Sequence, residues 1–273
     1  MQPLSVYRNE FPITESYTYL NHASVSPLPR RTASAIRGLI EDQHRHGSIH
    51  YREWCEAGDA LRRSAAELIH ASPDEIAIVK NTSEGLSVIA NGLDWKPGDL
   101  VVGVSGEFPA NYFPWKRLDR RGVKLRWVEQ RSGRVELDDL DKACRGARLL
   151  AISFVQYLSG FRIDLDAVGE ICGRHDCLLV VDAVQGLGPF PVDVKKSGVQ
   201  ALSAAAHKWL LGPEGLGILF VDRDLIPEVE PIEFGWTNVA SWPSYNLEKK
   251  LAPGAYLYEF LIANQFFCFV LQD

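Results

Sequence analysis

The sequence has few cysteines, and none of them form a CxxC pair. Its five cysteines, in 273 residues, are Cys55, Cys144, Cys172, Cys177 and Cys268. An odd number without paired spacing favours a reducing compartment over a disulfide framework. The first residues also lack the basic start and continuous apolar stretch of an export signal, so we expect a cytoplasmic protein.

Blocks of like charge are absent as well. The formal net charge of -6 is spread along the chain, which excludes the basic footprint of a nucleic-acid-binding protein. The nucleotide-binding patterns GxGxxG after a strand and GxxxxGK[ST] are missing. The most apolar stretch, residues 256–272, is only 17 residues long and contains Glu259, Asn264 and Gln265, so it does not suit a membrane span.

What the sequence does contain is an alternation of strand and helix patterns. Helical periodicity covers residues 30–40 and 57–69. Short aliphatic runs then follow at 75–80, 100–105, 123–129, 148–156, 177–184 and 217–222, with helix-length segments between them. This order predicts an α/β fold with a mostly parallel sheet and helices on both faces. We expect a helical segment at 1–70, an α/β domain at 71–245 and an atypical apolar tail at 246–273.

Ligands of such folds bind beyond the carboxyl ends of the strands, so we examined the residues that follow each predicted strand. Thr82 and Ser83 lie in a hydroxyl-rich turn that opens a helix, where free backbone N–H groups favour an anion such as phosphate. Ordinary helix capping explains the same residues. Phe108 follows another strand and either stacks on a planar ligand or belongs to the core.

Two further strand ends carry ionisable groups. Asp182 ends an all-apolar run, and a carboxylate there requires a cation or hydrogen-bond donors. A pyridinium nitrogen, an arginine or a neighbouring loop would each provide them, and Gln185 follows three residues later. Lys208, next to His207, lies between a small-residue run and a glycine-rich stretch, which favours an imine-forming amine over a solvated surface lysine.

Together these residues supply a phosphate cradle, a stacking ring, an acid for a ring nitrogen and a lysine for an aldehyde. Those are the requirements of pyridoxal 5′-phosphate (PLP). The motifs YLNHASVSPLP, NTSEGL, EFPANYFPW, VQYLSGFRIDL, VVDAVQGLG and HKWLLGPEGLG resemble the class V aminotransferase family, which includes cysteine desulfurases, kynureninases and isopenicillin N epimerase-like proteins. The resemblance covers residues 17–245 and implies the large domain of the PLP-dependent fold type I.

The resemblance also implies roles for individual residues. Lys208 corresponds to the lysine that forms the Schiff base with PLP, Asp182 to the partner of the pyridine nitrogen, and Gln185 to the donor toward the ring hydroxyl oxygen. With Lys208 and Asp182, His207 completes the expected catalytic set. The implied reaction is transfer, elimination or epimerisation of an amino-acid substrate.

The remaining roles concern the phosphate and the ring face. Thr82, Ser83 and His207 correspond to phosphate contacts. Phe108 stands on the ring face where the desulfurases have a histidine, which points away from a standard desulfurase. Fold-type I sites usually lie at a two-fold interface, so we expect a homodimer if the tail permits it.

The end of the chain departs from the family. Relatives continue into a small C-terminal domain that carries an arginine for the substrate carboxylate, and they tend to read Glu-x-Gly-Thr-Pro-Asn where this chain reads EFLIAN at 259–264. We expect the small domain to be largely missing from a truncated or frame-disrupted product. A PLP-binding but inactive homologue is therefore the alternative to an active enzyme.

The histidines in two parts of the sequence remain to be interpreted. His44, His46 and His50 are close in sequence, but their mixed-charge surroundings indicate a solvated helix end, and we expect no metal site. His22 lies in the YLNHAS motif, where it either contacts substrate or is a hydrogen-bonded loop residue.

Overall fold

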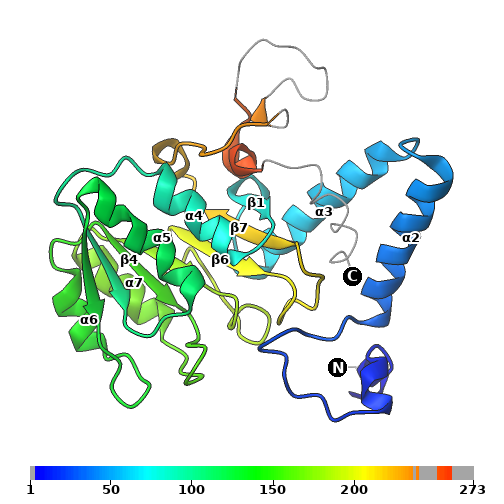
Figure 1. Cartoon of the computed structure of the whole chain (residues 1–273), viewed down its shortest axis with the longest axis horizontal. Helices are drawn as coiled ribbons and strands as arrows, with labels where there is room; N and C mark the ends of the chain where they lie inside the picture. The colour runs from blue at the N-terminus through cyan, green and yellow to red at the C-terminus, as the bar shows by residue number, and fades with distance from the viewer. Residues whose placement is uncertain (1–3, 236–237, 240–250, 260–273) are drawn as a thin grey trace.

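The computed structural model describes residues 4–235, 238–239 and 251–259, which form an α/β body around one seven-stranded sheet (Figure 1). The strand order is β1-β7-β6-β5-β4-β2-β3. The strands are β1 (Ile76–Val79), β2 (Leu100–Val104), β3 (Lys124–Val128), β4 (Leu149–Ser153), β5 (Leu178–Asp182), β6 (Ala201–Ala205) and β7 (Gly217–Val221). Pairs from β3 to β6 are parallel, whereas β7 runs antiparallel to both β6 and β1. The expected mostly parallel sheet is confirmed.

Helices cover both faces of the sheet, as predicted. The α-helices are α1 (Leu4–Arg8), α2 (Arg30–His46), α3 (Tyr51–Ile69), α4 (Thr82–Gly92), α5 (Phe113–Lys116), α6 (Leu137–Cys144) and α7 (Leu165–Arg174). The short 3-10 helices are η1 (Pro12–Glu15), η2 (Pro73–Glu75), η3 (Pro109–Asn111), η4 (Arg117–Arg121), η5 (Ile226–Glu228) and η7 (Gly254–Tyr258). The two periodic segments at 30–40 and 57–69 lie within α2 and α3, which project together at the right of Figure 1.

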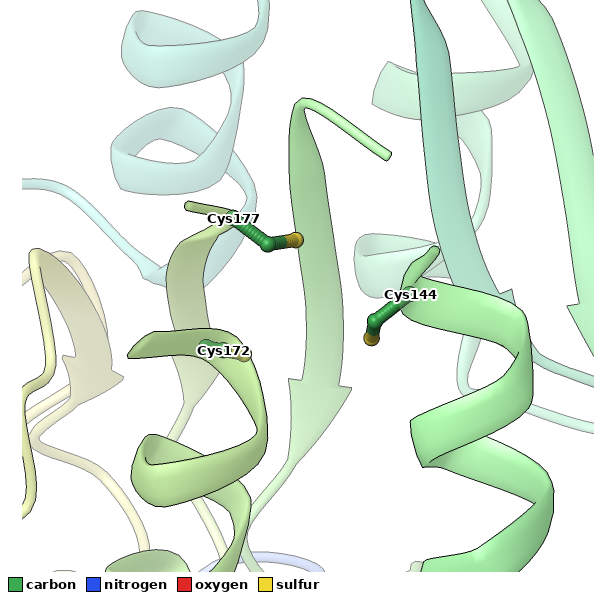
Figure 2. Close-up of side chains that lie close together, drawn as sticks. All are labelled: Cys144, Cys172 and Cys177. Atoms are coloured by element: carbon green, nitrogen blue, oxygen red, sulfur yellow. The ribbon is translucent and has the colours of Figure 1, made fainter. Parts of the chain in front are cut away.

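Alternate strand residues build two separate cores. On one face, Val102 and Val181 pack with apolar residues of α3, α6 and α7. On the other, Val101 and Val180 pack with α4, α5 and η7. The alternation follows from the period of two in a strand, and burial on both faces explains why the strands read as continuous apolar runs. The first core also contains three cysteines that come close together (Figure 2).

The sequence patterns did not predict one central strand, β6. β6 consists of ALSAA, whose small residues have low strand propensity, and the sequence indicated only a small-residue run there. The strand forms because it pairs with β5 on one side and β7 on the other. α4 also packs very closely against β6. A Cβ on Gly85 of α4 would lie 2.3 Å from Ser203 Oγ of β6, so this contact requires small residues.

The expected tail at 246–273 falls largely outside the described residues. Within residues 251–259, η7 packs beside β1, and Glu259 forms an ion pair with the buried Arg62 of α3. Its Oε1 also accepts a hydrogen bond from Ile78 N at 2.9 Å. Among the described residues, no helix is both long and apolar enough to cross a membrane.

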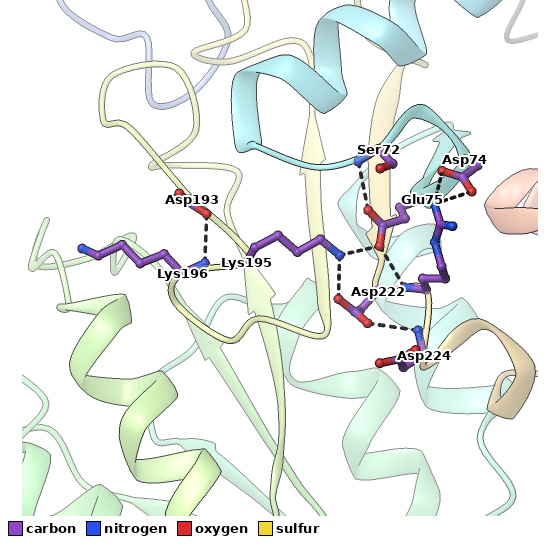
Figure 3. A network of polar contacts seen from close by, with 9 residues as sticks. Ser72, Asp74, Glu75, Asp193, Lys195, Lys196, Asp222 and Asp224 are labelled. Carbon is purple, nitrogen blue, oxygen red and sulfur yellow. Dashed lines mark hydrogen bonds and ion pairs between the residues drawn. The ribbon is translucent and has the colours of Figure 1, made fainter.

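A buried carboxylate ties the start of β1 to distant parts of the chain (Figure 3). Glu75, whose side chain is 2% exposed, accepts hydrogen bonds from Ser72 N and Arg223 N at 2.9 Å each. Its Oε1 also binds Lys195 Nζ, which lies 2.8 Å from Asp222 Oδ2. The network joins the turn before β1 to the residues that follow β7.

We predict that Glu75→Ala lowers the free energy of unfolding by about 2–4 kcal/mol, because it leaves two backbone donors without their acceptor and Lys195 with Asp222 as its remaining partner. The matched control is Asp74→Ala. Asp74 pairs with Arg223 on the surface, so its loss should cost less than about 1 kcal/mol. Urea unfolding of both variants measures the difference, and equal effects would contradict the importance of burial.

Candidate active site

A pocket of about 530 Å³ opens where the carboxyl ends of five strands meet. Thr82 and Ser83 follow β1, Phe108 follows β2, Asp182 ends β5, and Lys208 follows β6. His207, Gln185 and Tyr157 also line it. The structure therefore brings together the seven residues predicted to bind the cofactor, although their functional roles stay predictions.

Asp182 is the buried carboxylate of this pocket, with 3% of its surface exposed. Its Oδ1 accepts a hydrogen bond from Val184 N at 3.0 Å, and no lysine, arginine or histidine of the described residues lies within 4.0 Å of the carboxylate. The pKa of Asp182 is raised to about 7, chiefly by burial and also by the charge of Glu107, whereas the hydrogen bond from Val184 N–H and the charge of Lys208 oppose the shift. The site thus holds a carboxyl group that lacks a charged partner.

The amine of Lys208 lies in the same pocket. Its Nζ is 5.6 Å from the centre of the Phe108 ring and makes no hydrogen bond or ion pair with the described residues. Partial burial lowers the pKa of Lys208, and the charge of Asp182 opposes that shift. Phe108 is 43% exposed and meets Tyr157 edge to face at 5.3 Å. The pocket therefore combines an unengaged amine with an accessible aromatic ring.

The start of α4 forms the anion-attracting end of the pocket. Asn81 caps the helix by accepting a hydrogen bond from Glu84 N at 2.9 Å. Thr82 is buried, and its Oγ1 accepts a hydrogen bond from Ala205 N at 3.0 Å, so its hydroxyl proton remains available to a ligand. The side chain of Ser83 is exposed at the pocket. Free N–H groups and the helix dipole favour negative charge at this position.

His207, the residue before Lys208, also lines the pocket. It is half-buried, and burial lowers the pKa of its imidazole; the charge of Lys208 lowers it further, against the opposing charge of Glu214. A neutral imidazole at neutral pH is the consequence. One of its ring nitrogens is then a donor toward a ligand oxygen.

Gln185 is already engaged by protein groups. Its Nε2 donates to Ala23 O at 2.9 Å, and its Oε1 accepts from Trp209 Nε1 at 2.9 Å. One Nε2 proton remains for a ligand, so the predicted donor role is compatible with these contacts. Trp209 also stacks on His22 at 5.5 Å. His22 thus packs against the residue after Lys208 and is not among the residues that line the pocket.

The patterns missed a second buried carboxylate behind the pocket. Glu107 is 7% exposed, and its Oε1 accepts hydrogen bonds from Ser153 N at 2.8 Å and Gln156 Nε2 at 3.0 Å, while Oε2 binds Ser153 Oγ. Burial raises the pKa of Glu107 above its ordinary value, although these donors oppose the shift. Tyr157 was missed as well. Both residues follow predicted strands, which is the signal that could have found them.

The histidine group of α2 lies elsewhere. Asp42 Oδ1 hydrogen-bonds His46 Nδ1 at 2.8 Å and His50 Nδ1 at 2.7 Å, and Trp54 Nε1 donates to Asp42 Oδ2. These bonds lower the pKa of Asp42, and the bond to Asp42 raises that of His50. The Asp42 carboxylate is therefore hydrogen-bonded to three side chains near the end of α2.

Comparison with known proteins identifies the family. The model of the family described as aminotransferase class-V matches residues 18–254. This chain belongs to the class-V aminotransferase family. The family assignment agrees with the motifs in its sequence, and the fold places those motifs around one pocket.

Several relatives of this class-V chain carry the name cysteine desulfurase. A probable cysteine desulfurase of Methanothermobacter thermautotrophicus is 33% identical over 242 residues, which cover 85% of this chain and 60% of the relative. An uncharacterised aminotransferase of Bacillus subtilis is 31% identical, covering 84% and 62%. The apo structure of a cysteine desulfurase from Thermococcus onnurineus superposes with a TM-score of 0.90 at 27% identity, covering 100% of this chain and 70% of that one. The chain spans about 60% of the length of these curated relatives.

The raised pKa of Asp182 makes the stability of this class-V chain depend on pH. The folded state keeps a proton on Asp182 that the unfolded chain releases near the ordinary aspartate pKa of 3.8, so this group's contribution to stability falls as the pH rises from about 4 to about 7 and stays low above that. Asp182→Asn does not titrate. We predict that it stabilises the ligand-free protein by roughly 2 kcal/mol at pH 8.

Thermal unfolding after extensive dialysis measures this effect. The variant should unfold roughly 4–8 °C above the parent at pH 8 and show a smaller gain at pH 5. Glu84→Gln is the control, because that carboxylate is paired with Lys80 at 2.8 Å. A gain that does not change between the two pH values would refute the titration of Asp182.

Proposed function

We propose that the pocket binds pyridoxal 5′-phosphate and that the chain acts through it on an amino-acid substrate by transfer, elimination or epimerisation. The observation that carries the proposal is the pairing of Asp182 and Lys208 in one pocket. One is a buried carboxyl without a charged partner, and the other is an amine without a hydrogen bond among the described residues.

The residues present fit the cofactor at its ring. A protonated pyridine nitrogen would give Asp182 the cationic donor that it lacks, and the resulting pair would favour the ionised carboxylate. The Phe108 ring, 43% exposed at the pocket, offers a face for stacking. The remaining Nε2 proton of Gln185 is a donor for the ring oxygen.

The residues also fit the phosphate. The N-terminus of α4 supplies backbone N–H groups, Thr82 supplies a hydroxyl proton, and the exposed Ser83 supplies a second hydroxyl. Neutral His207 adds a ring N–H donor. These donors lie on the strand-end edge of the sheet, where ligands of α/β folds bind.

When bound, PLP supplies an electron sink for the substrate carbon next to the amino group. The chain supplies the proton chemistry. The lowered pKa of Lys208 increases the fraction of neutral amine, which could attack a carbonyl or accept a proton from the substrate α-carbon. Asp182 would hold the proton on the ring nitrogen. Phe108 would help to exclude water from the pocket and has no group that transfers protons.

The decisive experiment is to add PLP to the purified chain, reduce with borohydride and locate the label by mass spectrometry of peptides. We expect a phosphopyridoxyl group on Lys208 and a visible absorbance band before reduction, because Lys208 is the one lysine among the described residues that lines the pocket with Asp182. Lys208→Ala should lose both signals.

The matched control is Lys142→Ala, which removes an exposed lysine of α6 far from the strand-end edge and should leave the label unchanged. Labels spread over surface lysines, or persisting in Lys208→Ala, would refute the cofactor assignment. A specific label that no amino acid displaces would instead identify a cofactor-binding chain without turnover, the alternative left by the sequence.

A homodimer belongs to the same proposal. Large apolar side chains next to the pocket are exposed, with Leu20 at 84% and Leu158 at 74%. They adjoin the pocket residues Asn21 and Tyr157, so a second copy placed at the pocket mouth would cover them. We also propose a cytoplasmic location, which the absence of any disulfide within the described residues supports.

Light scattering tests the assembly. We predict twice the chain mass at micromolar concentration, and Leu20→Glu with Leu158→Glu should shift the species toward the monomer because they place charge in an apolar contact. Ile40→Glu on α2 is the control, since this exposed residue is not beside the pocket. A monomer at all concentrations would refute the dimer.

A further inference from the structure

Three cysteines from separate parts of the sequence meet in the core on one face of the sheet. Cys144 ends α6, Cys172 lies in the last turn of α7, and Cys177 directly precedes β5. Figure 2 shows their side chains converging between the two helices and the sheet. All three sulfur atoms lie within 4.8 Å of one another. In a tetrahedral zinc site with Zn–S bonds of about 2.3 Å, sulfurs are about 3.8 Å apart, so small rotamer changes suffice to bind an ion.

We propose that Cys144, Cys172 and Cys177 bind one thiophilic divalent cation, represented by Zn²⁺, with His175 as the fourth ligand. Three cysteines and one histidine are an established ligand set for structural zinc. His175 lies within the same turn, in the order Cys172-x-x-His175-x-Cys177. The site lies apart from the PLP pocket and does not depend on the proposed function.

The contacts of His175 fit the form that binds a metal. Its Nε2 lies 3.2 Å from Asp141 Oδ1, and Asp141 is on α6 one turn before Cys144. A metal-binding histidine commonly donates one ring N–H to a carboxylate, which leaves the other nitrogen unprotonated for the metal. The imidazole is not within the 4.8 Å group of sulfurs, so binding requires a shift of the ring toward them.

The turn from Cys172 to Cys177 brings two of the ligands together and provides a path for the ion. Cys172 O accepts hydrogen bonds from His175 N at 3.1 Å and from Cys177 N at 3.0 Å. Asp176 has a left-handed φ of 52°, which closes the turn. Gly173 and Asp176 are exposed, so local opening of the turn exposes the buried thiols.

The alternative use of these cysteines is as small apolar side chains of the core. Cys144 and Cys172 are 0% and 1% exposed and Cys177 is 6% exposed, which suits either use. A close group of three sulfurs distinguishes the metal site, since packing alone does not require the thiols to face one another.

The site lies at the opposite end of the strands from the PLP pocket. Cys177 precedes Leu178, the first residue of β5, whereas Asp182 is its last. Five strand residues at about 3.3 Å each separate the two by roughly 16 Å. A bound ion would join α6, α7 and β5 without contacting the pocket, which is the arrangement of a structural metal rather than a catalytic one.

The test uses Co²⁺ as a spectroscopic probe of the full chain, reduced and freed of metal under anaerobic conditions. We expect one Co²⁺ per chain with intense sulfur-to-cobalt charge-transfer absorbance and the visible bands of tetrahedral cobalt, both abolished by Zn²⁺. Saturating Zn²⁺ should raise the thermal midpoint by about 5 °C. Replacing all three cysteines of the site by alanine should remove these signals, whereas Cys55→Ala should retain them.

PLP labelling of Lys208 and far-UV circular dichroism report whether the triple variant still folds. If the triple variant does not fold, the test is made on the unmutated protein, in which Zn²⁺ should protect three thiols from a thiol reagent. His175→Ala should weaken Co²⁺ binding at least about tenfold and shift the visible bands. Absorbance of octahedral cobalt only, unprotected thiols, or an equal Zn²⁺ shift in the triple variant would overturn the site.

Discussion

The buried carboxyl group of Asp182 is the constraint on which the pocket depends. β5 lies in the centre of the sheet and is covered on both faces. Asp182, its last residue, is therefore largely shielded from water. The nearby charge of Glu107 adds to the cost of ionising it. A protein that only had to be stable would replace this aspartate, because an uncompensated buried carboxylate is unfavourable. Under the proposed function, the protonated ring nitrogen of the ligand would complete the charge balance of Asp182.

Much of this arrangement was predictable because strands and their ends have strong sequence signals. Buried parallel strands read as aliphatic runs, and the residue after each run lies at the ligand-binding edge. This reasoning found seven of the residues that line the pocket, namely Thr82, Ser83, Phe108, Asp182, Gln185, His207 and Lys208. Asp182 and Lys208 were the clearest, since each is chemically out of place in its apolar or small-residue surroundings.

Other features depend on contacts between distant parts of the chain. The small residues of β6 gave no strand signal, because its neighbours β5 and β7 determine its conformation. The hydrogen bonds of Glu107 come from residues 46 and 49 positions away. Gln185 was found, but its contact with Ala23 spans 162 positions. Likewise, the spacing of the cysteines did not reveal that Cys144 meets the other two.

The hydrogen bond from Ala205 N to Thr82 Oγ1 attaches the start of α4 directly to β6. The close contact of Gly85 with Ser203 prevents the helix from sliding along that strand. Lys208 follows only three residues after Ala205, so the anion-binding helix end and the reactive amine belong to one rigid unit. The distance between the start of α4 and the Lys208 amine is therefore fixed. Under the proposed function, a ligand would have to carry its anionic group and its carbonyl at that one spacing.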